Sequence, residues 1–267
     1  MILSNNTTQK PWIDKQLVAR SFAHSRYTYE QEASVQRQIA EKMMRLLENV
    51  LTTYHATHLP RHLVEVGCGT GSFSRMLQDK FHPESLLLND LCPEMKECLK
   101  DLCRNPHIRF LAQDAEILEF PAQTQLIASC STVQWFNHPN VFLQHCHQAL
   151  TDSGWLAIST FGPQNMHQIR QLTGHGLTYL NLEAWKKMLS PKFHIIHAEE
   201  EIAELRFDSP LDVLKHMKQT GVTGTEKRMW TRGILQSFCQ QYIQLFSQEN
   251  QQVSLTYHPI YLIAKKK

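Results

Sequence analysis

Three glycines stand at alternate positions directly after an apolar run in the segment LVEVGCGTGSF, residues 63–73. Gly67, Gly69 and Gly71 are three of only ten glycines in the 267-residue chain. The apolar run is typical of a buried strand, and glycines at its end allow a sharp turn in which a ligand can approach the backbone. The spacing therefore predicts a ligand-binding turn at residues 67–71.

Two common glycine turns do not fit this segment. The phosphate loop requires a Lys directly after its last glycine, and no Lys follows Gly71. The dinucleotide fingerprint places two residues before its third glycine, whereas only Thr70 separates Gly69 from Gly71. Glu65, just before the turn, would also be a poor neighbour for a pyrophosphate. These features disfavour a nucleotide triphosphatase and an ordinary dehydrogenase.

Acidic residues near the ends of three successive apolar runs favour S-adenosylmethionine, which has an amino group and a sulfonium but no phosphate. Glu65 can meet the amino group, directly or through water. Asp90 follows the turn by about twenty residues, where a carboxylate can accept hydrogen bonds from both ribose hydroxyls. Asp114 can accept from the adenine amine. Any one of them could be an ordinary turn or cap residue, but together they predict a cofactor site.

The predicted cofactor site also takes in neighbouring residues of the same turns. It comprises Glu65, Gly67, Cys68, Gly69, Gly71, Asp90, Leu91, Asp114, Ala115 and Ser131.

These residues require a sheet that brings strand ends together. Between residues 62 and 161, strand-like runs at 62–67, 85–90, 108–114, 126–131 and 155–161 alternate with helical patterns at 72–81, 93–103 and 139–150. Such alternation predicts a Rossmann-like, doubly wound α/β fold with a mostly parallel, seven-stranded sheet. Ligands of such sheets bind at the carboxyl ends of the strands.

The segments on either side of residues 62–161 have a less regular pattern of strands and helices. Residues 15–54 form a helical prelude in two pieces separated by the aromatic stretch 22–33. After Phe161 we expect a polar loop at 162–176, a helix at 181–189, one long strand at 193–207, helices at 209–221 and 231–246, and a closing strand at 254–264. The two late strands would form an antiparallel pair at the sheet edge.

Composition narrows the class of protein. The net charge of +2 gives no general argument for nucleic acid or a membrane as partner. Seven scattered cysteines disfavour a disulfide framework and a structural zinc site, so we expect no metal and a reducing, cytoplasmic setting. Neither a membrane-spanning run nor a signal peptide is evident.

The motifs resemble a known superfamily. The segments VEVGCGTG, NDLCPEM and QDAEILEFP are similar, in order and spacing, to the cofactor motifs of the class I S-adenosylmethionine-dependent methyltransferases. The more selective segments FAHSRYTYEQEASVQRQIAEKM, SCSTVQWF, LAISTFGPQN, VLKHMKQTGVTG and LTYHPIYLIAKK together resemble the malonyl-acyl-carrier-protein O-methyltransferases of biotin biosynthesis, over nearly the whole chain. The resemblance implies methylation of the free carboxylate of a malonyl thioester, held by an acyl-carrier protein, on the way to a pimeloyl chain.

A carboxylate acceptor explains why no acid or base residue is nominated. It is already anionic at neutral pH, so attack on the sulfonium methyl needs no general base, and alignment and exclusion of water remain the catalytic task. Substrate-binding candidates are Tyr29 as a hydroxyl donor, Gln134 to orient an oxygen and Trp135 to exclude water. Tyr29 could instead staple the prelude to the core, and Trp135 could serve packing alone.

The cation that would hold the carboxylate stays open between Arg170, Lys215, Lys218 and Arg228. His258 is more simply read as a structural histidine. A basic rim for the acidic carrier protein is expected in TEKRMWTRG, which contains Lys227, Arg228, Trp230 and Arg232, although a solvated helix start is the simpler alternative. The segment FLQHCHQAL lacks the arginine-leucine ending usual in the family, which puts any basic residue's role there in doubt.

The expected organisation has five parts: a helical prelude or lid at 1–60, a cofactor-binding core at 61–162, its continuation at 163–208, a helical cap at 209–252 and a closing strand with a basic tail at 253–267. Two alternatives remain open for the function. One is a methyltransferase for another small carboxylate, such as trans-aconitate. The other is a non-catalytic partner protein that binds S-adenosylmethionine.

Overall fold

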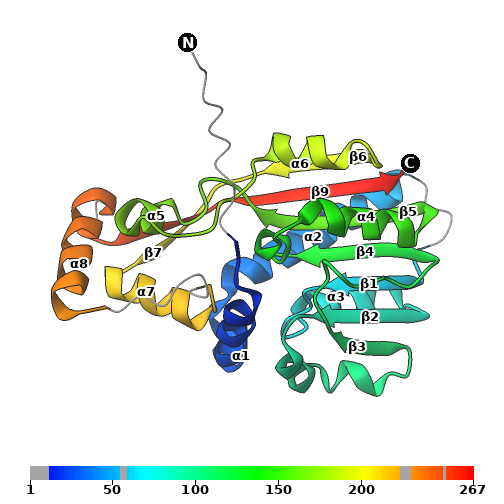
Figure 1. The fold of residues 1–267 in the computed structure, drawn as a ribbon, viewed down its shortest axis with the longest axis horizontal. Helices are drawn as coiled ribbons and strands as arrows, with labels where there is room; N and C mark the ends of the chain where they lie inside the picture. The colour runs from blue at the N-terminus through cyan, green and yellow to red at the C-terminus, as the bar shows by residue number, and fades with distance from the viewer. Residues whose placement is uncertain (1–11, 55–58, 223–229, 249–250) are drawn as a thin grey trace, which may run out of the picture.

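The computed structural model describes residues 12–54, 59–222, 230–248 and 251–267. A seven-stranded sheet in the order β3-β2-β1-β4-β5-β9-β6 forms its centre (Figure 1). Neighbouring strands from β3 to β5 pair in parallel, and β9 runs antiparallel between β5 and β6. This confirms the predicted fold class and its antiparallel edge pair. The strands are β1 (His62–Val66), β2 (Ser85–Asp90), β3 (Ile108–Ala112), β4 (Thr124–Cys130), β5 (Leu150–Phe161), β6 (Phe193–Glu200) and β9 (Pro259–Lys266).

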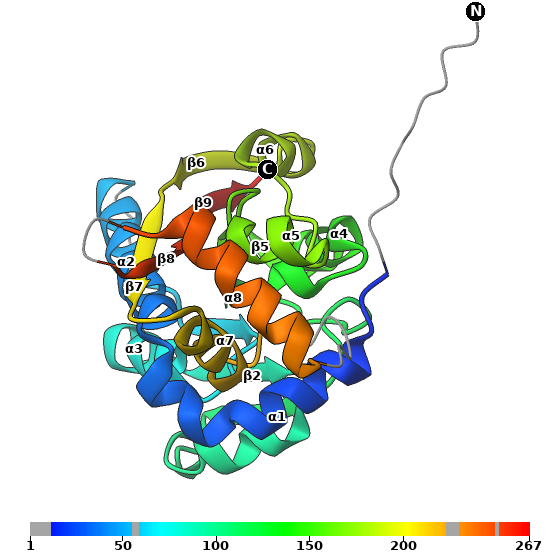
Figure 2. The ribbon, with the colours of Figure 1, turned by 90° about the vertical axis from the view of Figure 1, so that its left-hand side faces the viewer.

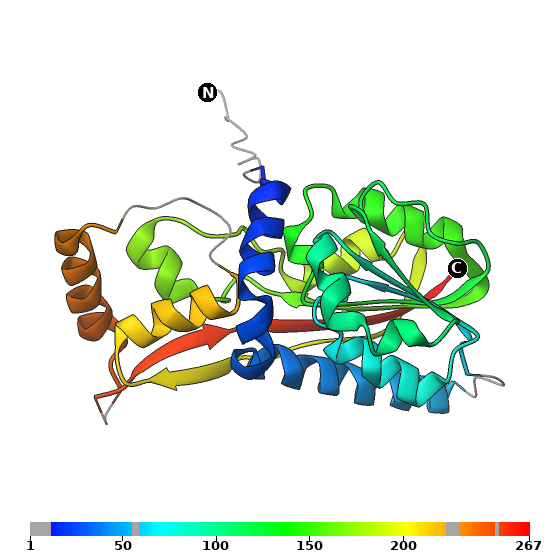
Figure 3. The same cartoon turned by 90° about the horizontal axis from the view of Figure 1, so that it is seen from below.

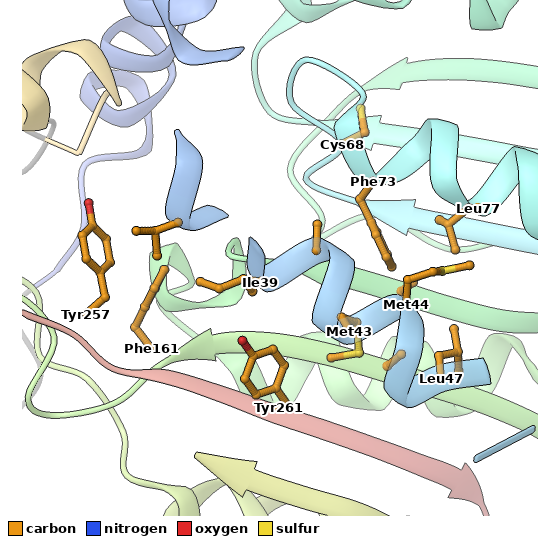
Figure 4. Close-up of a cluster of buried hydrophobic side chains, with 14 of the residues drawn as sticks. Ile39, Met43, Met44, Leu47, Cys68, Phe73, Leu77, Phe161, Tyr257 and Tyr261 are labelled. Atoms are coloured by element: carbon orange, nitrogen blue, oxygen red, sulfur yellow. The ribbon is translucent and has the colours of Figure 1, made fainter. Parts of the chain in front are cut away.

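Helices cover both faces of this sheet. On one face, α2 (Ser34–Thr53) and α3 (Ser72–Phe81) pack against the strands; on the other lie α4 (Pro139–Ala149) and α6 (Leu182–Leu189). In α2 the buried residues Ile39, Met43 and Leu47 recur every four positions, so one helix face enters the core (Figure 4). Burial of both sheet faces accounts for the nearly continuous apolar strands.

The prelude begins with α1 (Lys15–Glu32), whose first turn is capped by the Asp14 carboxylate. The prediction that the aromatic stretch would separate two helices was wrong, because residues 22–32 lie inside α1. The chain changes direction at Ala33 alone, whose N–H still bonds to the Tyr29 carbonyl at 2.8 Å. A single residue therefore suffices to redirect the chain into α2.

The helix expected at 93–103 is instead two short 3-10 segments, η1 (Pro93–Leu99) and η2 (Leu102–Arg104). The guanidinium of Arg75 donates to the Cys98 carbonyl at 3.1 Å. That carbonyl would bond to residue 102 in a continuous α-helix. A side chain from α3 thus competes for the carbonyl group that a continuous helix would use as an acceptor.

The single strands expected at 193–207 and 254–264 are both interrupted. β7 (Ala203–Phe207) and β8 (Val253–Tyr257) form a separate two-stranded sheet, and the chain turns out of it at residues 201–202 and at His258. β9 pairs with β5 up to the match of Pro259 with Phe161. No strand among the described residues extends the main sheet past Phe161 alongside β9. The segment that follows β6 and the segment that precedes β9 therefore leave the main sheet at the same place.

We call α5, β7, α7, α8 and β8 the cap. The segment 162–176, expected to be a loop, contains α5 (His167–Thr173), while α7 (Pro210–Gln219) and α8 (Arg232–Phe246) lie where helices were predicted. α7 and α8 stand at one end of the molecule, and α1 packs against α7 (Figure 2). Figure 3 shows α1 standing between the cap and the sheet.

Within the described part of the chain, no helix has the length and apolar character needed to cross a membrane.

Candidate active site

The glycine turn has the geometry that its sequence predicts. Gly67, Gly69 and Gly71 have φ angles of 73°, 52° and 90°, in the left-handed region that side chains disfavour. A Cβ on Gly67 would lie 2.0 Å from the Thr132 hydroxyl, and one on Gly71 would lie 2.6 Å from Leu99, whereas one on Gly69 would meet no atom within 4 Å. Gly69 therefore presents open backbone where a ligand can approach.

Asp90 fastens this turn to the next strand end. One carboxylate oxygen accepts from the Gly69 N–H at 2.9 Å, and the other accepts from the Cys92 N–H at 2.8 Å. Burial raises the pKa of Asp90, and these backbone donors oppose that shift. Since each oxygen can accept more than one hydrogen bond, Asp90 can hold the turn and still bind hydroxyls in the hollow that it lines.

Glu65 is the most deeply buried acidic group of the site, with 1% of its surface exposed. One of its carboxylate oxygens, Oε2, has no hydrogen-bond partner among the described residues. Burial raises the pKa of Glu65 to about 8, and the nearby negative charge of Asp90 adds to the shift while Arg75 opposes it. A buried carboxyl group with one unpartnered oxygen at the turn is suited to meet a cationic ligand group.

Asp114 is engaged in a way that sequence reasoning did not anticipate. Its oxygens lie 2.6 and 2.5 Å from Nζ of Lys15, the first residue of α1. The same ammonium also pairs with Glu116, whose other contacts are the backbone N–H groups of Asn137 and His138. Lys15 thus fastens the start of α1 over the adenine end of the expected site.

The strand ends and α1 together enclose a hollow of about 820 Å³, counted with its open mouth. It brings together nine of the predicted site residues: Tyr29, Gly67, Gly69, Asp90, Leu91, Asp114, Ala115, Ser131 and Trp135. We call it the cofactor hollow. A side hollow shares Tyr29, Gly67, Gly69 and Ser131 with it and adds Glu65 and Cys68. Gly71 lines neither of them and is instead the N-cap of α3.

A third hollow, which we call the acceptor cavity, lies under the cap and encloses about 1750 Å³ with its open mouth. Its walls are mainly apolar and come from α5, α7 and the start of α8. Trp135 lines both this cavity and the cofactor hollow, and Gln36 lines both this cavity and the side hollow. The acceptor cavity therefore adjoins the cofactor hollow at Trp135.

The predicted substrate residues lie at or beside this junction. Tyr29, on α1, is half-buried with its ring 6.4 Å from that of Phe22, and burial raises its pKa. Trp135 packs edge to face on Phe22 at 5.6 Å, so it also fixes α1. Gln134 lines the acceptor cavity, but its amide donates to the Ser131 carbonyl and its oxygen accepts from Thr160.

The basic candidates are distributed unevenly around the acceptor cavity. Arg170, Lys215 and Lys218 all line it. Arg228, like Lys227, lies outside the described residues. His258 takes the structural role favoured from sequence: its ring lies 3.1 Å from the Glu200 carboxylate and accepts from the Gln164 N–H at 3.1 Å.

Sequence reasoning missed several residues that line the cofactor hollow, because the approach of α1 brings some of them there. They are Lys15, Val18, Phe22, Arg26, Val66, Thr70, Asn89, Met95, Gln113, Cys130, Thr132 and Phe136. Gln113 and Thr132 could have been included as neighbours of predicted residues. The α1 residues carry no motif, and only their helical spacing points to a shared face.

The comparisons agree with this geometry. Residues 64–158 match the methyltransferase domain family. A malonyl-[acyl-carrier protein] O-methyltransferase of Bacteroides helcogenes is 56% identical over 275 residues, covering 96% of this chain and 100% of the relative. One of Bacteroides thetaiotaomicron is 48% identical over 268 residues, with coverage of 96% and 99%. The solved structure of the YcgJ protein from Bacillus subtilis shares the fold, with a TM-score of 0.57 at 14% identity, covering 82% of this chain and 99% of that one. The chain therefore belongs to the malonyl-[acyl-carrier protein] O-methyltransferase family.

Proposed function

We propose that this O-methyltransferase transfers a methyl group from S-adenosylmethionine to the free carboxylate of a malonyl thioester carried by an acyl-carrier protein. The names of its relatives support the substrate. The structural observation that carries the proposal is the junction at Trp135 between the cofactor hollow and the acceptor cavity. The product would be a methyl ester, as biotin biosynthesis requires.

The residues of the cofactor hollow and of the adjoining side hollow fit S-adenosylmethionine. The unpartnered Glu65 oxygen suits the amino group, Asp90 offers acceptors for the ribose hydroxyls, and Gly69 leaves room for a ligand beside its backbone. When bound, S-adenosylmethionine supplies a methyl group on a positively charged sulfur, which a carboxylate oxygen takes up while the sulfur keeps the bonding electron pair.

The chain's own residues then have to orient and shield rather than move protons. A carboxylate acceptor carries no proton at neutral pH, so no base is needed. α1 covers the cofactor hollow: it is fastened by Lys15 at its start and by bonds from Ser21 and Thr28 to the Gly221 and Gln219 carbonyls, at 2.9 and 3.0 Å. We expect this cover to limit the access of water to the reacting groups.

We place the carrier protein at the cap, where the acceptor cavity opens. Lys215, Lys218 and Arg232 are exposed there, beside the exposed apolar side chains of Leu211 and Ile234. Acidic surfaces associate with such basic patches through interactions that salt screens. Activity on the carrier-linked substrate should therefore fall as salt rises, while activity on malonyl-coenzyme A should change much less.

One assay tests the proposal. Purified protein receives labelled S-adenosylmethionine together with malonyl-acyl-carrier protein, malonyl-coenzyme A or free small diacids, and the product is tested for a base-labile methyl ester. We expect label mainly on the carrier-linked substrate. Label on free diacids alone would reject the thioester assignment. Absence of label despite intact cofactor binding would favour a non-catalytic binding protein.

Binding of S-adenosylmethionine should release a proton from Glu65. Its pKa is about 8 in the ligand-free protein, and a cationic amino group beside it would lower that pKa. At pH 6.5 we expect release of close to one proton, and affinity should rise from pH 6 toward 8. Calorimetry in phosphate and Bis-Tris buffers, which both buffer at this pH and differ in ionisation enthalpy, measures the proton count.

Glu65→Gln is the matched control, because it keeps the size of the side chain and cannot ionise. It should bind with no proton release, and equal release from both proteins would contradict the assignment.

The raised pKa of Glu65 also affects the stability of the fold. Its protonated form contributes fully to the free energy of unfolding below the ordinary pKa of 4.5, and this contribution is lost as pH rises through about 8. The ligand-free protein should therefore become less stable over that range, and Glu65→Gln should not.

Lys15→Met should speed the dissociation of S-adenosylmethionine about tenfold, because it removes the ammonium that fastens α1 to Asp114 and Glu116. Stopped-flow displacement measures this rate. Lys42→Met is the matched control, since Lys42 is also half-buried and pairs with two carboxylates, Glu199 and Glu201, at 2.7 and 2.6 Å, without lining any of the three hollows. Equal rates for both variants would show that Lys15 does not control release.

A further inference from the structure

The inner end of the acceptor cavity, where it meets Trp135, is lined by neutral polar side chains. Gln36, Gln134, Tyr179 and Tyr257 line this cavity. Tyr257 is fully buried, with none of its surface exposed. It comes from β8, at the base of the cap, and Figure 4 shows its ring beside Phe161.

The described cations of this cavity are not available at that end. The guanidinium of Arg170 donates to the Asn165 carbonyl at 2.6 Å and to the Pro163 carbonyl, and it lies over the Tyr179 ring at 5.4 Å. Lys215 and Lys218 are exposed on α7, toward the mouth of the cavity. The two lysines in the lining are thus exposed to solvent, whereas Gln134 and Tyr257 are buried.

The Tyr257 hydroxyl is held from the cap side. It lies 2.8 Å from Nε2 of His216 on α7, a residue with 5% of its surface exposed. Burial lowers the pKa of His216, which favours the neutral ring. With its proton on Nε2, the ring donates to the Tyr257 oxygen, and the phenol hydrogen stays free for another acceptor.

Other polar groups gather at the same hydroxyl. Burial is the main cause that raises the pKa of Tyr257, and the nearby hydroxyls of Tyr29 and Tyr179 raise it further. A hydrogen bond with the Gln36 side chain opposes this shift. The Gln36 carbonyl oxygen is buried without a hydrogen-bond partner among the described residues. Tyr29 connects this group to the cofactor hollow, which it lines.

We propose that the Tyr257 hydroxyl, positioned by His216, donates a hydrogen bond to the malonyl carboxylate and holds it at the junction with the cofactor hollow. The inference rests on the proposed function and names a substrate-binding residue for it. His216 acts only through Tyr257 and is a positioning residue.

A neutral donor suits this reaction better than a buried cation. The attacking oxygen loses negative charge as its bond to the methyl carbon forms, so an ion pair would stabilise the bound acceptor more than the transition state. A hydrogen bond from a phenol orients the carboxylate but stabilises the bound acceptor less than an ion pair would, so it raises the activation barrier less. The exposed lysines at the mouth remain suited to attract the anionic substrate.

Tyr257→Phe tests the inference, because it removes the hydroxyl and keeps the ring that packs on Phe161. We expect kcat/KM for malonyl-acyl-carrier protein to fall about 10- to 100-fold, with the affinity for S-adenosylmethionine unchanged. Tyr242→Phe is the matched control: Tyr242 is equally buried, its hydroxyl donates to the Ser254 carbonyl at 2.9 Å, and it lines none of the three hollows. It should lose stability only.

Two substitutions of His216 give a second test, which remains valid even if Tyr257→Phe does not fold. His216→Gln keeps a donor near the position of Nε2 and should retain most activity, whereas His216→Leu should lose it about as far as Tyr257→Phe. Wild-type kcat/KM in Tyr257→Phe, or equal loss in His216→Gln and His216→Leu, would overturn the inference while leaving the proposed function intact. Absence of methyl ester with the wild-type protein would overturn both.

Discussion

Asp90→Ala is expected to lower the affinity for S-adenosylmethionine about 30- to 150-fold, or about 2–3 kcal/mol. The substitution removes the acceptors proposed for the ribose hydroxyls. It also leaves the N–H groups of Gly69 and Cys92 without the carboxylate that now binds them at 2.9 and 2.8 Å. The turn then loses both its ligand contact and the bond that fixes its shape, so the two effects add.

Isothermal calorimetry with S-adenosylmethionine measures this loss, and thermal unfolding of the ligand-free protein measures the accompanying loss of stability. Asp152→Asn is a suitable control, because it removes one negative charge from a fully exposed position near the start of β5, far from the strand ends that carry the site. Affinity should not change in the control. If Asp90→Ala bound with wild-type affinity, the ribose assignment would have to be abandoned.

Gly67→Ala is expected to destabilise the protein by about 2–5 kcal/mol, the sum of about 1–2 kcal/mol for a left-handed alanine and about 1–3 kcal/mol for overpacking. Gly67 has φ of 73°, and the new methyl carbon would lie 2.0 Å from Oγ1 and 2.6 Å from Cβ of Thr132. This is a large part of the stability of an ordinary domain. Chemical denaturation of the ligand-free protein provides the measurement.

Two further variants separate the backbone strain at position 67 from the steric conflict of the new methyl group with Thr132. Gly174→Ala places alanine at φ of 70° with no atom within 4 Å of the new carbon, so it should lose only the backbone contribution. The double variant Gly67→Ala with Thr132→Gly should recover most of the overpacking contribution, which a double-mutant cycle isolates. An equal loss in Gly67→Ala and Gly174→Ala would mean that the contact with Thr132 is unimportant.

The sheet could be predicted from the sequence because parallel strands buried on both faces leave apolar runs at regular intervals. The errors occurred where tertiary contacts decide the outcome. Arg75 binds a carbonyl that a helix at 93–103 would use, and β9 pairs with β5 only as far as Phe161, next to the separate sheet of β7 and β8. Neither cause is visible in local composition.

Some residues of the candidate site could be predicted from local sequence, and others are brought together only by tertiary contacts. Gly67, Gly69 and Asp90 could be found because turn geometry and strand ends constrain residue type locally. Lys15 could not, because its partner Asp114 is 99 positions away along the chain and one lysine in a helix carries no pattern. Tyr257 and His216, 41 positions apart, likewise meet only after α7 has packed against the two-stranded sheet of β7 and β8.

The two-stranded ribbon of β7 and β8 has a consequence for how such enzymes diversify. The excursion from β7 to β8 leaves the sheet after β6 and rejoins it at β9, and the pairing of Ala203 with Tyr257 holds these two points side by side. Insertions, deletions or wholesale exchange of residues between them leave the register of the main sheet untouched. The part of the acceptor cavity that α7 and α8 supply can therefore vary independently of the donor site. A chimera that exchanges the excursion alone should keep the donor while altering the preference among acceptors.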